Sequence, residues 1–352
     1  MIAVPRTLRD RRIQIDVLVW GGLLALPFFL GEWEVSQLAL YLTYGIFAMS
    51  LALIWGQCGL MSFGHAVFFG LGAYAMSLST LGMLPGLESW TSSYFGLALA
   101  LALPAAFANL LGRFLFFGRG LQGAQLAIVM LAVAVVAERL MARWPYAGGM
   151  NGLMSVPPVN LGGFGITVEI FDPLPLYYLT AVAALVVYVL LERLLRSEQG
   201  VLLRAVGSDE TRTGFLGYDT RAVKLRVFTL SAAVAGFAGA LFVTQFGFVS
   251  PPLIGFGLST EVLIWVALGG RSALLTAFLG AIVVRLAEDR LADLLGAGWL
   301  LGLGLLFVLC VIFLPRGLLG EVYWRVTKPR GAGPAPRSPD GSGAPAAGHW
   351  QD

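Results

Sequence analysis

The polar segment SDETRTGFLG, residues 208–217, has the residue types that build a short docking helix. Its serine and Asp209 are good N-cap residues, and Glu210 falls in the first turn, where the helix dipole favours negative charge. Gly214 and Gly217 then allow a turn or a close backbone approach. Such a segment suits insertion into a groove on another protein. The alternative is a solvated loop whose arginines only fix the membrane topology.

A second set of polar side chains lies within long apolar runs, where polar groups are candidates for function. The strongest is Glu261, in LSTEVLIWVALGG, which could face a solute pathway or cap a helix. Five others could line a polar pathway or hold helices together by hydrogen bonds, and the sequence leaves both roles open. They are Tyr44, Gln57, His65, Asn109 and Gln245.

Two kinds of chemistry lack their motifs in this sequence. The lysines are Lys224 and Lys328, and neither follows a glycine as the phosphate-binding pattern G-x-x-x-x-G-K-[ST] requires. We therefore expect no cofactor on this chain and expect any ATP to act through another subunit. The histidines are His65 and His349, and no metal-binding cluster surrounds either, which argues against a metal hydrolase.

The composition is that of an integral membrane protein. Hydrophobic residues make up 58% of the 352 residues and charged residues only 12%, against about a quarter in soluble domains. Apolar stretches of about 20 residues predict helices rather than a β-barrel. Cys58 and Cys310 lie in apolar surroundings, typical of small buried side chains rather than of a disulfide or metal site. The net charge of +3 gives no reason to expect a nucleic-acid partner.

The apolar runs predict an all-α protein with eight to ten membrane-spanning helices, ten being the preferred number. The first run is too long for a cleaved signal peptide, so we expect a retained span. The windows are approximately 13–30, 35–55, 65–83, 93–112, 121–142, 174–192, 225–247, 258–270, 272–290 and 298–315.

With ten spans, the positive charges predict that both termini are cytoplasmic. All but four of the 23 lysines and arginines then lie on the cytoplasmic side, as the positive-inside rule requires. The transmembrane domain would cover residues 1–325, with a cytoplasmic loop at about 193–224 and an extracytoplasmic loop at about 144–173. The Pro- and Gly-rich tail, residues 326–352, is expected to be a disordered cytoplasmic segment.

Small residues recur at helical spacing in two of the predicted helices. Ala232, Gly236 and Ala240 form one stripe, and Ala66 and Gly70 form a shorter one. Small residues let helix backbones approach closely in lipid, so we expect both stripes to be packing surfaces. The glycines at 56, 59 and 64 could let the chain re-enter the membrane as a non-helical turn.

Several segments together resemble the permease subunits of branched-chain amino acid and urea or amide ATP-binding cassette (ABC) importers. They cover about residues 40 to 320 in the same order. The similar segments are GQCGLMSFGHAVFFGLGAYAM, AGGMNGL, DETRTGFLGYDTRAVKLRVFTLSAAVAGFAGALF, SPPLIGFGLSTEVLIWVALGGRSAL and LGLLFVLCVIFLPRGLLG.

The resemblance implies a role for the 208–217 segment. In that family a glutamate followed seven residues on by a glycine marks a short helix that docks in the ATPase, here Glu210 and Gly217. It implies a heterodimer with a second permease chain, two cytoplasmic ATPase subunits and a periplasmic solute-binding protein in the bacterial inner membrane, surrounded by lipid. The ATPase-coupling residues would be Asp209, Glu210, Thr211, Arg212, Gly214 and Gly217.

The solute is the open point of this interpretation. DETRxxFLGY, VTQFGFVSP and EVLIWVALGGR are more similar to urea and short-chain amide permeases, so urea or an amide is the preferred solute. Branched-chain amino acids are the alternative. GGRSALLTAFLGA departs from the family's GGRGTLIGPVLGA, which weakens that preference. A secondary transporter or channel that works without an ATPase is an alternative of another class.

Overall fold

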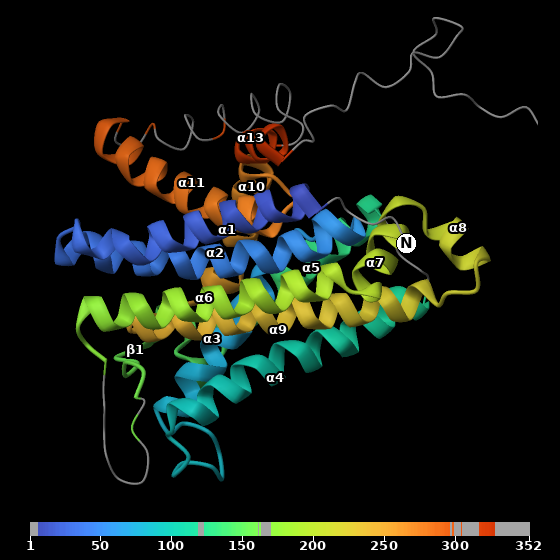
Figure 1. The fold of residues 1–352 in the computed structure, drawn as a ribbon. Coiled ribbons are helices and arrows are strands. Elements are labelled where there is room, and N and C mark those ends of the chain that lie inside the picture. The colour runs from blue at the N-terminus through green and yellow to red at the C-terminus, as the bar shows by residue number, and fades with distance from the viewer. Residues whose placement is uncertain are drawn as a thin grey trace, which may run out of the picture.

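The structure is a computed structural model that describes residues 6–118, 123–160, 162, 170–295, 298, 304 and 317–327. These residues are almost entirely helical, so the predicted all-α membrane fold is confirmed (Figure 1). The helices are α1 (Arg6–Ala25), α2 (Glu32–Cys58), α3 (Ala66–Thr80), α4 (Ser93–Gly112), α5 (Gly123–Arg143), α6 (Pro173–Arg196), α7 (Glu198–Ser208), α8 (Glu210–Phe215), α9 (Thr220–Phe246), α10 (Phe256–Gly269), α11 (Leu274–Leu295) and α13 (Leu318–Thr327).

Short elements join these helices at their ends. Single 3₁₀ turns are η1 (Leu26–Phe28), η3 (Pro145–Ala147), η4 (Gly149–Asn151) and η5 (Pro251–Ile254), and a π-helical turn, η2 (Arg113–Gly118), extends α4. Two-residue strands, β1 (Leu153–Met154) and β2 (Phe248–Val249), pair antiparallel. This pairing fastens the segment after α5 to the end of α9. Part of the predicted extracytoplasmic loop is therefore folded onto the bundle, and residues 161 and 163–169 lie outside the description.

Nine of the ten predicted windows coincide with helices, and the tenth, 298–315, falls almost wholly outside the described residues. Five helices are long and apolar enough to cross a membrane alone: α2, α4 with η2, α5, α6 and α9. The apolar part of α1 and all of α3 are shorter. Among the described residues, fewer helices are long enough to span a membrane than the eight to ten spans that the sequence predicts.

The pair α10 and α11 differs from its prediction as two successive spans. The helix direction bends by 116° between them, and by length and composition the two together make one broken span or a re-entrant segment. The 14 residues of α10 reach only about 21 Å at 1.5 Å per residue, less than the roughly 30 Å of a bilayer core. Gly270, with φ of 117°, makes the turn.

Helices α1 and α6 run antiparallel. The hydroxyl of Tyr177, early in α6, donates to the carbonyl oxygen of Leu23, late in α1, at 2.5 Å. Arg196, at the end of α6, lies 3.9 Å from the Asp16 carboxylate. The start of α1 therefore lies at the same end of the bundle as α7 and α8, which the orientation prediction requires if both are cytoplasmic.

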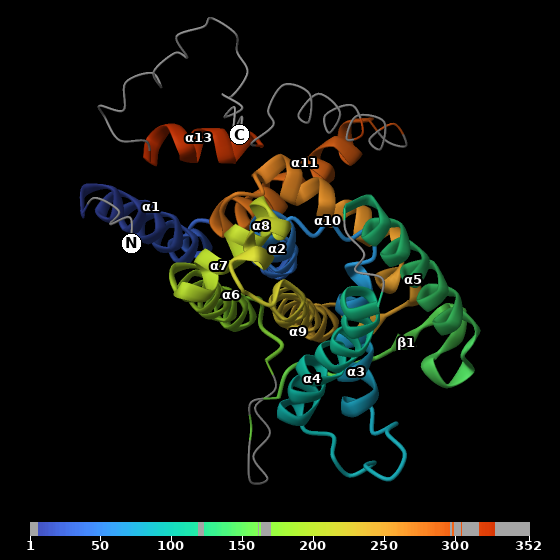
Figure 2. The same cartoon turned by 90° about the vertical axis from the view of Figure 1, so that its right-hand side faces the viewer.

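Two helices, α2 and α9, form the centre of the bundle, and the others surround them (Figure 2). On α9, a Cβ at Gly236 would overlap the carbonyl oxygen of Ala100 in α4, and one at Gly239 would overlap that of Phe69 in α3. Backbone meets backbone here, as small residues permit in lipid. Ala232 and Ala240, the other members of that stripe, are fully buried.

The shorter stripe of α3 contacts different elements. Gly70 packs against Ile254 of η5, and the backbone amide of Ala66 donates to the Ser259 hydroxyl of α10 at 3.1 Å. The glycine of α3 that meets α9 is Gly72, which abuts the backbone of Gly236. One face of α3 thus contacts α9, while Ala66 and Gly70 fix α3 to η5 and α10.

We predict that Gly236→Ala destabilises the protein. The added methyl meets the α4 backbone, and overpacking of this kind costs about 1–3 kcal/mol, which outweighs the roughly 1 kcal/mol by which alanine favours a helix. Thermal unfolding of the detergent-solubilised protein should show a lower midpoint.

The matched control is Gly22→Ala in α1, where an added Cβ meets nothing within 4 Å. Its midpoint should stay the same or rise. Equal midpoints for the two variants would contradict the close backbone approach at Gly236.

Candidate functional site

The segment that the sequence singled out folds as a capped helix. Asp209 has an extended backbone and its Oδ1 accepts from the amide of Arg212 at 2.9 Å, so it is the N-cap of α8. The hydroxyl of Thr213 donates to the carbonyl oxygen of Asp209 at 2.8 Å. The capping pattern read from the sequence is therefore present, and it fixes where α8 begins.

Glu210 points back to the bundle rather than outward. Its Oε1 lies 2.6 Å from Nζ of Lys224 and accepts from the Thr220 hydroxyl at 3.1 Å, both on α9. The Lys224 side chain is only 2% exposed, and Nζ also lies 5.3 Å from the ring centroid of Phe116. A buried cation needs a partner, so this ion pair fixes α8 to the first turns of α9.

Sequence reasoning did not assign a role to Lys224. The residue stands 14 positions after its partner, beyond a glycine turn, so helical spacing gives no indication of the contact. Its only signal was the rarity of lysine in the chain.

The tip of α8 is exposed. Phe215 and Leu216 are 86% and 76% exposed, and Tyr218 is exposed beside them. Gly214 has open space around it, and Gly217 turns the chain with φ of 89°. Thr211 and Arg212 are exposed as well. We call Phe215, Leu216 and Tyr218 the α8 tip; it is an apolar surface with no partner among the described residues.

Helix α7 connects this segment to the end of α2. A Cβ at Gly207 would meet the carbonyl oxygen of Gln57 at 2.5 Å, and Gly59, with φ of 71°, ends α2 close by. The Gln57 amide in turn donates to the carbonyl oxygen of Ser272, in the turn between α10 and α11, at 3.2 Å. A continuous set of contacts thus runs from α7 through the end of α2 to the bent pair.

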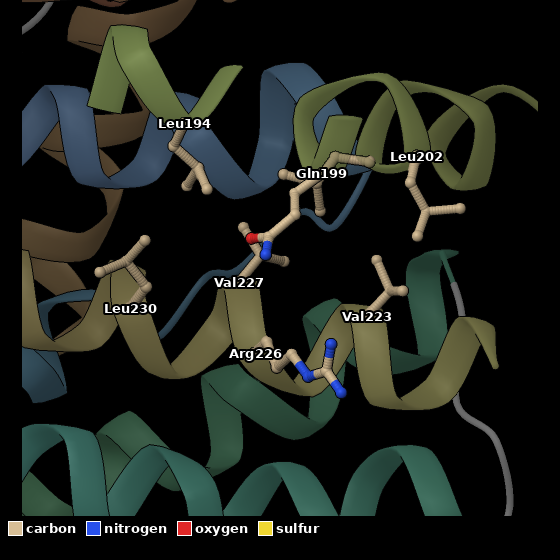
Figure 3. A pocket seen from close by; sticks show the side chains of 8 residues that line it. Leu194, Gln199, Leu202, Val223, Arg226, Val227 and Leu230 are labelled. Atoms are coloured by element: carbon tan, nitrogen blue, oxygen red, sulfur yellow. The ribbon is translucent and has the colours of Figure 1, made fainter. Parts of the chain in front are cut away.

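The contact between α7 and α9 is incomplete. A cavity of about 80 Å³ separates α7 and the end of α6 from α9 (Figure 3). Gln199 projects into the gap between the helices, and Arg226 lies on the α9 side. The remaining lining is apolar: Leu194, Leu202, Leu203, Val223, Val227 and Leu230.

The pathway candidates do not lie along one route. His65 is fully buried, with Nε2 2.8 Å from the Ser50 hydroxyl and its ring stacked on Phe47. The Gln245 amide donates to the hydroxyls of Thr43 and Thr180, both at 2.9 Å.

Gln57 lies apart from these two, at the end of α2. Of the six candidates, Tyr44 and Glu261 are the two that the structure brings into one cluster, around Arg285. At these three positions, His65, Gln57 and Gln245 each make contacts that join different helices.

That cluster is centred on Arg285 of α11. Its guanidinium lies 2.7 Å from Glu288 and 3.9 Å from Glu261, and its Cζ is 4.9 Å from the ring centroid of Tyr44. The neighbouring Asp289 accepts a hydrogen bond from Tyr41 of α2. Charged residues at 285, 288 and 289 within an apolar window were the sequence signal for this group, but the partners from α2 and α10 were not predictable.

Residues 35–314 match the protein family described as the permease component of branched-chain amino acid transport systems. The chain belongs to this permease family. The match covers most of the chain and nearly every helix described above. It confirms the expected class, a multi-pass membrane protein with a transport role and not an enzyme.

Named relatives support the same assignment. The permease is 33% identical to the high-affinity branched-chain amino acid transport system permease protein LivM of Escherichia coli, over 89% of this chain and 76% of that protein. It is 25% identical to BraD of Pseudomonas aeruginosa, over 82% and 94% of the two chains. It is 22% identical to LivH of Escherichia coli, over 79% and 92%. No solved structure matches the chain.

These relatives bear on the solute. All three are named for branched-chain amino acid transport, and a nearest relationship to urea-type permeases is not shown. The comparisons favour the alternative, branched-chain amino acids, over the urea or amide that the sequence motifs favoured.

We predict that Lys224→Met loosens α8. Glu210 loses its charged partner, and a hydrogen bond to a charged group contributes about 1.5–3 kcal/mol. Amide hydrogen exchange across residues 209–217 should accelerate by about tenfold or more, since about 1.4 kcal/mol corresponds to tenfold.

Arg212→Met is the matched control. It removes a cation from the exposed pair with Asp209, which stabilises little. Exchange in that variant should stay near the wild-type rate. If the two variants exchange alike, the buried pair is not what holds α8.

Proposed function

We propose that this permease is one of two membrane subunits of an ABC importer that carries branched-chain amino acids into a bacterial cell. The observation that carries the proposal is its 33% identity to LivM across most of both chains. Similarity to LivH of the same organism supports pairing with a second, related permease chain. Two ATPase subunits would hydrolyse ATP at the cytoplasmic face, and a periplasmic binding protein would deliver the solute.

The α8 tip is where the ATPase would dock. Phe215 and Leu216 are large apolar side chains exposed on a short helix at the end of the bundle, and burying them against a partner would be favourable. The Lys224–Glu210 pair holds α8 against α9 while the tip stays free. A push on the tip is therefore transmitted to the start of α9.

Two routes would carry that push into the membrane. The first is α9 itself, whose backbone contacts with α3 and α4 make it move as a unit with them. The second runs through Gly207 to the end of α2 and on to Ser272 at the bent pair. The cavity separates α7 from the first turns of α9, whereas deeper in the bundle α2 and α9 contact each other directly, for example through Gln245 and Thr43.

Orientation follows from the same assignment. ATP is in the cytoplasm, so α8 and the start of α1 would face it, in agreement with the positive charges of the sequence. The permease would then lie in the inner membrane with both termini cytoplasmic. The segment after α5, held by β1 and β2, would face the periplasmic binding protein.

Uptake into cells with and without the permease tests the solute. Radiolabelled leucine and urea would be supplied at micromolar concentration, with ATP depletion as a further arm. We expect loss of the permease to abolish ATP-dependent leucine uptake and leave urea uptake unchanged.

Other outcomes would change the proposal. Loss of urea uptake alone would reinstate the amide interpretation. Leucine uptake that needs the permease but survives ATP depletion would indicate a secondary transporter or channel.

We predict that Phe215→Asp weakens ATPase docking strongly without unfolding the permease. A charge replaces the apolar side chain that the partner would bury, while the contacts of α8 with α9 remain. Co-purification of the ATPase subunits should fall by about tenfold or more, as the loss of a buried interface anchor of about 2 kcal/mol or more predicts.

Leu87→Asp provides the control. Leu87 is an exposed leucine in the connection between α3 and α4, at the opposite end of the bundle from α8. That variant should retain the ATPase. Full co-purification with Phe215→Asp would contradict docking at the tip.

A further inference from the structure

The Arg285 cluster lies near the middle of the bundle. Tyr44, over whose ring the guanidinium sits, is 12 residues from Glu32 and 14 from Cys58, the ends of α2. At 1.5 Å per residue these distances are about 18 Å and 21 Å, so Arg285 is well inside the hydrocarbon region. Charges at this depth are costly and face protein or water rather than lipid.

The cluster has a sealed side and an open side. Glu288 is only 4% exposed, and Tyr44 and Trp265 flank the guanidinium of Arg285 at 4.9 and 6.0 Å. On the other side Arg285 is 21% exposed and Glu261 is 39% exposed. A carboxylate this exposed at mid-membrane indicates that this edge borders water or a second protein chain.

The two partly exposed charges, Arg285 and Glu261, interact with each other only weakly. Arg285 makes its close ion pair with Glu288 at 2.7 Å, while Glu261 is 3.9 Å away, beyond hydrogen-bonding distance. The aromatic rings and Glu288 hold the guanidinium in place from behind. The result is a fixed positive and a fixed negative charge side by side on one open edge.

We propose that Glu261 and Arg285 form a transient binding site within the membrane, here called the passing site. It would bind the ammonium and carboxylate groups of an α-amino acid rather than a neutral amide. The carboxylate of the solute would meet Arg285, and its ammonium group would meet Glu261. Each charge of the zwitterion thus finds its opposite at membrane depth, which lowers the cost of crossing. The inference rests on the proposed function and names how the solute is recognised within the membrane.

The test uses the complete importer in proteoliposomes, with the unaltered solute-binding protein and labelled leucine. Because the binding protein is the same throughout, a change in uptake belongs to the permease. Glu261→Gln and Arg285→Gln should each lower leucine uptake by about tenfold or more while ATP hydrolysis stimulated by the binding protein continues. Arg285→Lys keeps the charge and should recover part of the uptake.

The matched control is Glu192→Gln, which neutralises the carboxylate of the Arg196–Glu192 pair at the end of α6. Its uptake should equal that of the wild type. A photoreactive diazirine analogue of leucine supplies a second readout that is independent of uptake. It should label peptides of α10 or α11 in the wild-type importer, and Glu261→Gln should lose that label.

The outcomes separate the two proposals. If the wild type transports leucine but both glutamine variants match it, the passing site is wrong and the proposed function stands. Absence of photolabel from α10, α11 and α2 in a working importer also overturns the site. A wild-type importer that moves no leucine overturns the proposed function, and the site falls with it.

Discussion

The close approach of helix backbones around α9 is the constraint on which the rest of the structure depends. Lipid offers apolar helices no hydrophobic reason to associate, so packing must come from contact between the helices themselves. Gly72, Gly236 and Gly239 supply it by letting α3 and α4 meet α9 without intervening side chains. Because α9 follows α8 directly in the chain, the helix that organises the bundle is also the one on which ATPase docking at the α8 tip would act.

Lys224 and Arg285 are cations within the bundle, and each lies beside a carboxylate and an aromatic ring. Lys224 is sealed between Glu210 and an aromatic ring, and its role is to hold α8 in place. Arg285 is held in the same way from behind, but its front edge is open beside Glu261. In the proposed mechanism the sealed pair would transmit force, whereas the open pair would exchange partners with the solute. That difference is why the second, and not the first, is assigned to the solute.

The bent pair α10–α11 connects the end of α2 to the Arg285 cluster. Its turn at Gly270 is linked to α2 through Ser272 and Gln57, and so to α7 and α8. Its two arms carry Glu261 and Arg285. A movement that changes the 116° bend would change the distance between these charges, so the proposed solute site lies at the end of the proposed coupling route.

The sequence by itself determined the membrane class, the position of most helices and the capped segment with Asp209 at its start. These depend on composition, apolar run length and residue spacing, all of which are local properties. Tertiary structure decided which polar residues meet. It set Glu210 against Lys224, joined Tyr44 and Glu261 through Arg285, and placed His65, Gln57 and Gln245 in three separate positions. It also bent two predicted spans into one angled pair. The physical reason is that such contacts depend on how helices cross in space, and residues far apart in sequence carry no spacing pattern that records a crossing.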